Sequence, residues 1–259
     1  MFRRSVRLRL TIAYDGRPFA GWQSQPGGNT VQDHLERVVA TILKLEHPVP
    51  VHGSGRTDTG VHALAQVAHC EVPDDCRMEL AAWRRALNVH LPPAIRVLEV
   101  ARTAENFHAR FDATGKTYRY RLWHDEILPP LEAGLAWHVP HALDFDLLVA
   151  ACARCEGEHD FAALAANRGD GKDEGRDTVR TVWSVRVERA GPLVTLDFHG
   201  SGFLYKMVRM LTGSIVRVAQ KRATLSWLEH LLTAPAGEKT HHTAPANGLY
   251  LMRVDYGEQ

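Results

Sequence analysis

The chain has 259 residues, 45% of them hydrophobic and 24% charged, and a formal net charge of +1. This is the composition of an ordinary globular protein with a large core, and no apolar run approaches the roughly 20 residues that a membrane-spanning helix needs. The start, MFRRSVRLRLTIAY, mixes basic with apolar residues and predicts a strand, not a secretory signal; with only four cysteines, this predicts reduced thiols and a cytoplasmic location.

The first half of the chain predicts the order β-α-β-β-α-β. Alternating apolar residues at 6–12 predict a half-buried strand. Thr30 is the expected N-cap of a helix that presents Val31, Leu35, Val38, Val39 and Ile42 on one face. There follow a short strand, a strand over 64–72, a helix over 78–91 ended by two prolines, and a strand over 95–101. This order is that of a ferredoxin-like unit.

The second half predicts a comparable order. We expect a strand over 116–123, a helix over 144–157, a hairpin of strands 178–189 and 193–200, a helix over 202–220 and a closing strand over 248–256. The sequence therefore predicts an α+β protein of two ferredoxin-like halves, residues 1–109 and 110–259. They are expected to form one continuous antiparallel sheet with helices on one face and an active-site cleft between the halves. The polar segment 167–178 is predicted to be a mobile loop.

Positive charge is segregated along the chain although the net charge is small. Between Asp197 and Glu229 there is no acidic residue, and this stretch carries Lys206, Arg209, Arg217, Lys221 and Arg222. Further basic residues gather in 3–9 and 116–121. Such stripes fit a phosphate-binding face. The solvated faces of ordinary helices and strands explain them equally well.

A glycine-rich stretch, GSGRTDTGVHA (53–63), presents a single carboxylate, Asp58. Most Asp-x-Gly matches are simple turns. This loop is long for a turn between strands, and it clusters further polar residues around the aspartate: Arg56, Thr57, Thr59 and His62. It matches no P-loop pattern and no helix follows it. The stretch indicates a functional carboxylate.

Six blocks in order extend this pattern over about residues 8–255: YDGRPFAGWQSQ, TVQDHLE, GRTDTGVHA, FHARFDATGKTYRY, FLYKMVRM and PANGLYL. Together they resemble the TruA family of tRNA pseudouridine synthases. The resemblance implies an isomerase that breaks the N1–C1′ bond of uridine, rotates the base and rejoins it through C5, with no metal, redox cofactor or ATP. It further implies a homodimer acting on uridines 38, 39 and 40 of the tRNA anticodon stem-loop.

The resemblance also assigns roles within the site. Asp58 becomes the catalytic nucleophile facing a flipped-out uridine; attack on C1′, addition to C6 and proton abstraction at C2′ all remain open. Arg209 becomes the cation that keeps this carboxylate ionised; a solvated helix arginine is the alternative. Tyr118 becomes the ring that stacks on the base, although a core tyrosine is also consistent with its strand.

The remaining candidates concern RNA contacts. Arg56 is expected to fill the gap left by the flipped base or to hold a phosphate, with a buried structural arginine as the alternative. Lys206, Arg217 and Lys221 are candidates for the RNA backbone. The blocks depart from the family pattern at Met210, Thr212 and Asn247, where local packing and RNA contacts can differ.

Three other interpretations are weighed against this one. Cys152-x-x-Cys155 supplies only two of the four ligands of a structural zinc site, so packed thiols are favoured and no metal is expected. A non-catalytic RNA-binding module would share the ferredoxin-like halves, but its aromatic motif is absent and the Asp58 loop would have no purpose. The third is an Asp-dependent hydrolase acting on a sugar or phosphate. Glycoside hydrolysis normally needs two carboxylates, and no second one is found in the matching blocks.

Overall fold

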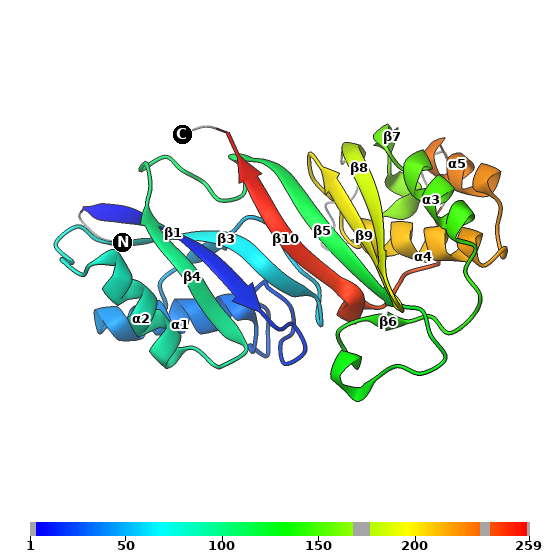
Figure 1. Ribbon diagram of the computed structural model, residues 1–259. Coiled ribbons are helices and arrows are strands. Elements are labelled where there is room, and N and C mark those ends of the chain that lie inside the picture. The colour runs from blue at the N-terminus through cyan, green and yellow to red at the C-terminus, as the bar shows by residue number, and fades with distance from the viewer. Residues whose placement is uncertain (1–3, 168–176, 234–238, 258–259) are drawn as a thin grey trace. The chain divides into compact units, whose positions relative to one another are not determined.

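The computed structural model describes residues 4–167, 177–233 and 239–257, so most of the predicted loop at 167–178 lies outside the described residues. Helices and strands are both present, which confirms the α+β class (Figure 1). Two compact units divide the chain: Met1–Thr114 with Tyr250–Gln259, and Gly115–Leu249. We call them unit 1 and unit 2.

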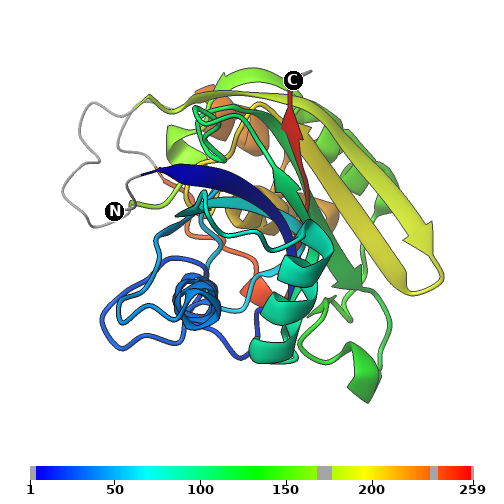
Figure 2. The same ribbon diagram turned by 90° about the vertical axis from the view of Figure 1, so that its left-hand side faces the viewer.

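Among its described residues, unit 1 contains two α-helices. Its elements up to residue 102 follow the predicted order β-α-β-β-α-β, and the strand at residues 249–256 joins them. Its elements are β1 (Ser5–Tyr14), α1 (Val31–Leu43), β2 (Val51–Gly53), β3 (His62–Pro73), α2 (Leu80–His90), β4 (Ile95–Arg102) and β10 (Leu249–Tyr256). The strands lie in the order β4-β1-β3-β10, and β2 pairs with β3 at the side. Both helices lie on one face of these strands, and Figure 2 shows α1 nearly end-on beside α2.

Local chemistry explains these elements. Leu8, Leu10 and Ile12 alternate into the core along β1, as their spacing predicts. Thr30 caps α1 through its hydroxyl, and the Asp33 carboxylate reciprocates on the Thr30 N–H, which completes a capping box. The helix α2 ends at His90, because the residue before a proline favours extended backbone.

Among its described residues, unit 2 contains three α-helices, three short 3-10 helices and the remaining strands. Its elements are β5 (Ala113–Trp123, which begins in unit 1), η1 (Pro130–Glu132), β6 (Trp137–His138), α3 (Phe145–Arg154), β7 (Gly157–Asp160), η2 (Ala162–Leu164), β8 (Val179–Ala190), β9 (Leu193–Gly200), α4 (Met207–Ala219), α5 (Leu225–Thr233) and η3 (Ala246–Gly248). The strands lie in the order β5-β9-β8-β7, with β6 on β5. The three helices pack together on one side of these strands (Figure 1).

The prediction that the sheet is antiparallel throughout is wrong. The pairs β3–β10 and β5–β6 run parallel. Parallel pairing needs a connection of about a dozen residues or more, and both pairs have one. All of unit 2 separates β3 from β10, and residues 124–136 separate β5 from β6.

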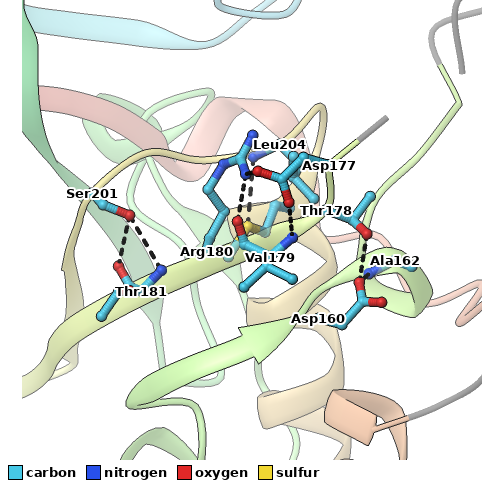
Figure 3. Close-up of polar contacts among 10 residues, drawn as sticks. Asp160, Ala162, Asp177, Thr178, Val179, Arg180, Thr181, Ser201 and Leu204 are labelled. Atoms are coloured by element: carbon cyan, nitrogen blue, oxygen red, sulfur yellow. Dashed lines mark hydrogen bonds and ion pairs between the residues drawn. The ribbon is translucent and has the colours of Figure 1, made fainter. Parts of the chain in front are cut away.

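The helix predicted over 202–220 begins five residues late, at Met207. Lys206 has a φ of 59°, a left-handed conformation that a right-handed helix cannot include. Upstream, the chain is still hydrogen-bonded to β8. The Ser201 N–H donates to the Thr181 carbonyl at 2.9 Å. The Ser201 hydroxyl accepts the Thr181 N–H at 3.2 Å and donates to the Thr181 carbonyl at 3.3 Å (Figure 3). The apolar spacing of 202–206 is that of a helix, but the left-handed backbone at Lys206 separates these residues from α4.

Residues on both sides of the gap at 168–176 are held by a shared carboxylate. Asp160 Oδ1 accepts from the Thr178 hydroxyl at 2.6 Å and from the Ala162 N–H at 3.0 Å (Figure 3). The strands β7 and β8 are therefore joined beside the point where the chain leaves the described region.

None of the helices in the described ranges has the length and hydrophobicity needed to cross a membrane. All four cysteines are free thiols. Cys152 and Cys155 are buried in and just after α3, and burial raises the pKa of the Cys152 thiol to about 12.

Candidate active site

Asp58 lies in unit 1, on the loop that joins β2 to β3. The side chain is half-buried, and its own carbonyl accepts the Val61 N–H at 3.1 Å, which closes a turn ahead of β3. Gly60 within that turn has a φ of +80°. Glycine adopts this left-handed conformation at little energetic cost, whereas a residue with a Cβ does not. The loop therefore presents the carboxylate from a defined turn.

A layer of buried polar side chains lies beneath this loop. The Ser54 hydroxyl donates to Gln66 Oε1 at 2.6 Å, and Gln66 Nε2 donates to the Gly55 carbonyl at 3.0 Å. The Tyr14 hydroxyl lies 2.8 Å from Thr57 Oγ1. Buried polar groups keep such partners because leaving them unpaired is costly, so the layer fixes the loop on the side facing the core.

Sequence reasoning did not single out this layer. A signal was present, because Gln66 is a fully buried polar residue on β3, paired with the fully buried Ile12 of β1. A polar side chain at a predicted core position indicates either an error of register or a structural hydrogen-bond network. Here it is a network. We call Tyr14, Ser54, Thr57 and Gln66 the buried polar layer.

The segment 15–22 holds the loop from another side through two glycines. A Cβ at Gly16 would lie 2.1 Å from the Val61 carbonyl oxygen, and one at Gly21 would lie 2.6 Å from the Thr57 carbonyl oxygen. The Trp22 N–H donates to that same Thr57 oxygen at 3.1 Å. Glycine in this segment thus permits the close approach of two backbones, and the Asp58 loop is held between them and the polar layer.

His62 marks the end of the loop. Its ring is 2% exposed, its Nδ1 accepts the Gly16 N–H at 3.2 Å, and it stacks on Tyr250 with ring centroids 4.5 Å apart. Asp15 Oδ1 lies 3.3 Å from the same Nδ1. The hydrogen bond from Arg17 holds the pKa of Asp15 below its usual value, against the raising effect of burial. His62 thus connects the loop with segment 15–22 and with β10.

Arg56 is exposed, two residues before Asp58, and its Nε donates to Gln23 Oε1 at 3.2 Å. Gln23 in turn donates to Gln32 Oε1 on α1 at 2.9 Å. The alternative of a buried structural arginine does not apply. The guanidinium reaches solvent on the face that also carries segment 15–25.

Tyr118 lies in unit 2 on β5. It is 8% exposed, and its ring meets that of Phe203 edge to face at 5.3 Å between centroids. Tyr120, two residues on, is fully buried, and its hydroxyl donates to the Pro245 carbonyl at 2.5 Å, as expected for a packing residue. Tyr118 thus rests against the segment that leads into α4.

Arg209 lies on the first half of α4 and is half-buried. Its Nε donates to the Ala244 carbonyl at 2.9 Å, and the Ala244 N–H donates to the Arg209 carbonyl at 3.0 Å. A Cβ at Gly213 would lie 2.2 Å from the His242 carbonyl oxygen. Segment 242–244 therefore packs closely against this face of α4 and orients the arginine.

Several basic residues have carboxylate partners within their own unit. On the strands, Arg7 pairs with Glu71, Arg119 with Asp197 and Arg121 with Glu132, at 2.6, 2.6 and 2.8 Å. Lys221 Nζ lies 3.1 Å from Asp144 Oδ2. Lys206 is placed at the N-cap of α4 with its Nζ 5.1 Å from the Tyr205 ring centroid, and Arg217 lies in the last turn. Much of the positive charge on the strands is thus balanced locally.

The candidate residues fall in both units: Asp58 and Arg56 in unit 1, Tyr118, Arg209, Lys206, Arg217 and Lys221 in unit 2. An ion pair between Asp58 and Arg209 stays a prediction. Among the described residues, no three His, Cys, Asp or Glu side chains are grouped to hold a metal ion.

Comparisons with known proteins agree on one family. The family model for tRNA pseudouridine synthase matches residues 10–112 and 151–257. A tRNA pseudouridine synthase A of Akkermansia muciniphila is 48% identical, covering 98% of this chain and 96% of that protein. Similar proteins of the same name occur in Solidesulfovibrio magneticus (48% identical; 97% and 92% covered) and Methylacidiphilum infernorum (41%; 97% and 96%).

Proposed function

Because the chain belongs to the tRNA pseudouridine synthase family, we propose that it isomerises uridines of tRNA to pseudouridine with Asp58 as the catalytic carboxylate. The enzyme is an isomerase of the intramolecular transferase class. The observation that carries the assignment of Asp58 is the fixation of its loop. Buried hydrogen bonds hold residues 54–57 from the core side, and the segment 15–22 holds them from another.

The reaction balances without any added reactant. The N1–C1′ bond of uridine breaks, the base turns, a C5–C1′ bond forms, the proton leaves C5 and N1 takes up a proton. Attack on C1′, addition to C6 and proton abstraction at C2′ all require Asp58 to be ionised. A bound base would cover the carboxylate and exclude water from it, and a neighbouring cation then stabilises the charge. We assign this part to Arg209.

The flipped base needs a surface that compensates for lost stacking. Tyr118 is our candidate, because a base on an aromatic ring recovers about 1–3 kcal/mol, comparable to the few kcal/mol lost on flipping. Phe203 supports the Tyr118 ring edge-on. Arg56, exposed beside Asp58, would occupy the gap in the stem or contact a phosphate. Met210, Thr212 and Asn247 change neither assignment.

The wider organisation follows the same proposal. Residues 1–109 and 110–259 would act as two ferredoxin-like halves with the uridine bound in a cleft between them. The substrate would be the anticodon stem-loop at positions 38, 39 and 40, bound through Lys206, Arg217 and Lys221, by a homodimer in the cytoplasm. No cofactor takes part in any step of this proposal.

Release of tritium from tRNA labelled at C5 of uridine tests the function directly. The isomerase must release it in step with the pseudouridine formed. A non-catalytic RNA-binding module would bind tRNA without release, and a glycosidic hydrolase would liberate free uracil. Either outcome would overturn the proposal.

A further inference from the structure

The segment that follows β4 places one large apolar side chain in solvent. Phe111 is 74% exposed, whereas Phe107, one turn earlier, is 1% exposed. A single exposed apolar residue needs no special explanation. What distinguishes Phe111 is that its backbone and both its neighbours are held in place.

The turn 108–112 is built around the His108 side chain. His108 Nδ1 accepts the Arg110 N–H at 3.1 Å and the Phe111 N–H at 3.3 Å. In the other direction, the His108 N–H donates to Asp112 Oδ2 at 2.8 Å, and the Asp112 N–H donates to the His108 carbonyl at 3.1 Å. Hydrogen bonds therefore fix the backbone that carries Phe111 from both ends.

Aromatic and cationic groups surround the exposed ring. The rings of His108 and Phe111 lie 4.2 Å apart between centroids, and the Arg110 guanidinium lies 5.6 Å from the Phe111 centroid. His52 continues the row, 6.0 Å from His108 and stacked on His69 at 5.1 Å.

The charge state of His108 suits this arrangement. Burial first, then the neighbouring His52 and Arg7, lower the pKa of His108, while Asp112 opposes them. His108 is therefore neutral near pH 7, and its unprotonated Nδ1 can accept the two backbone N–H groups.

We propose that Phe111, His108 and Arg110 form a second RNA-binding site, which stacks an unpaired nucleobase on Phe111 and contacts its phosphate through Arg110. Aromatic rings combined with arginine are how proteins bind unstacked bases. A hot spot for a protein partner would instead lie at the centre of a packed, water-free patch, and the groups around Phe111 are charged or polar. The inference rests on the proposed function, because it takes tRNA as the RNA, but it involves neither Asp58 nor its loop.

The test compares tRNA dissociation constants of full-length variants at one fixed salt concentration. We expect Phe111→Ser to weaken binding roughly five- to 150-fold, the equivalent of one lost stacking contact. Phe111→Trp should retain wild-type affinity. Val89 is the matched control, since it is 77% exposed in the same unit; Val89→Ser should change nothing.

A photoreactive phenylalanine analogue provides the direct measurement. Placed at position 111 it should crosslink to unlabelled tRNA, and placed at position 89 it should not. Equal tRNA affinities of Phe111→Ser and wild type overturn the site. So does a Phe111→Ser variant whose oligomeric mass changes while its tRNA affinity does not. If wild type still releases tritium in those cases, the proposed function stands. A wild type that neither binds tRNA nor releases tritium overturns both.

Discussion

The Tyr14 hydroxyl and Thr57 Oγ1 lie 2.8 Å apart beneath the Asp58 loop, and both side chains are buried. Burial raises the pKa of Tyr14 well above its usual value, so the hydroxyl stays protonated and available as a donor. The pair connects the end of β1 to the residue before the catalytic candidate. The position of Asp58 therefore depends on a contact made 43 residues earlier in the chain.

Tyr14→Phe should lower the free energy of unfolding by about 1–3 kcal/mol, because the buried Thr57 hydroxyl loses its partner. Denaturant unfolding followed by circular dichroism measures this. Thr57→Val in the Tyr14→Phe background should add little further loss, since both members of the pair are then apolar. Strictly additive losses would show that the two hydroxyls do not depend on each other.

Asp58→Asn should abolish pseudouridine formation while tRNA binding persists, because the amide cannot replace the carboxylate in any of the three possible roles. Tritium release and a binding isotherm on the same preparation measure the two effects. Asp15→Asn is a less suitable control, since Asp15 is engaged by Arg17. Asp75→Asn, at an exposed position outside the Asp58 loop, should retain turnover. Substantial turnover by purified Asp58→Asn would refute the assignment.

Tyr118→Leu should weaken turnover by about 1–3 kcal/mol through the loss of stacking. Tyr118→Phe keeps the ring and its contact with Phe203, so any large loss of rate in this variant must come from the hydroxyl. Single-turnover rates at saturating enzyme separate these cases. Equal rates for wild type and Tyr118→Leu would remove Tyr118 from the site.

Arg209→Ala should lower turnover, because it removes the cation proposed to stabilise the ionised Asp58 carboxylate beneath the bound base. Arg209→Lys should recover only part of the activity. An ammonium group supplies the charge but not the planar guanidinium, which can donate two parallel hydrogen bonds to a carboxylate. The hydrogen bond from Arg209 to Ala244 predicts a loss of stability as well. Melting curves must therefore accompany the rate measurements. Unchanged turnover in a folded Arg209→Ala variant would separate this residue from Asp58.

Acid should destabilise unit 1 through His69. Burial, followed by the charges of His108, His52 and Arg7, lowers the pKa of His69 to about 4, with Glu71 opposing. In the unfolded chain His69 binds this proton near pH 6.5. The free energy of unfolding is therefore unaffected by His69 above that pH, and it decreases as the pH falls from 6.5 toward 4. The loss is on the order of 3 kcal/mol.

Unfolding experiments between pH 7 and pH 4 measure this slope. His69→Gln keeps an acceptor for the Ala109 N–H, which His69 Nδ1 accepts at 3.1 Å, and it cannot titrate. The variant should be less stable at neutral pH but show a flatter slope. A slope as steep as that of the wild type would place the titrating group elsewhere.

The sequence predicted those features that depend on neighbouring residues. The alternation in β1 and the Thr30 cap are local, and both were predicted. The start of α4 was not, because the apolar spacing carries no information on the left-handed backbone of Lys206. The parallel partner of β10 was missed for a related reason, since strand direction depends on the path of the whole intervening chain.

The candidate site divides in the same way. Asp58 stood out because its loop has an unusual composition in the sequence itself. The buried polar layer did not, because Tyr14, Ser54 and Gln66 are ordinary residues in their own segments. Only the pairing of β1 with β3 brings them together. A motif shows which side chain acts, and long-range pairing decides what holds it.

The pairing of β10 with β3 has a consequence for biosynthesis. His62, at the end of the Asp58 loop, stacks on Tyr250, a residue made after the whole of unit 2. A nascent chain therefore cannot complete unit 1 while its first 114 residues are emerging from the ribosome. Domains commonly fold in the order of their synthesis, but here the unit that is begun first is finished last. The Asp58 loop acquires its Tyr250 neighbour only after unit 2 has been synthesised, so chains truncated before residue 250 would carry an Asp58 loop without this contact.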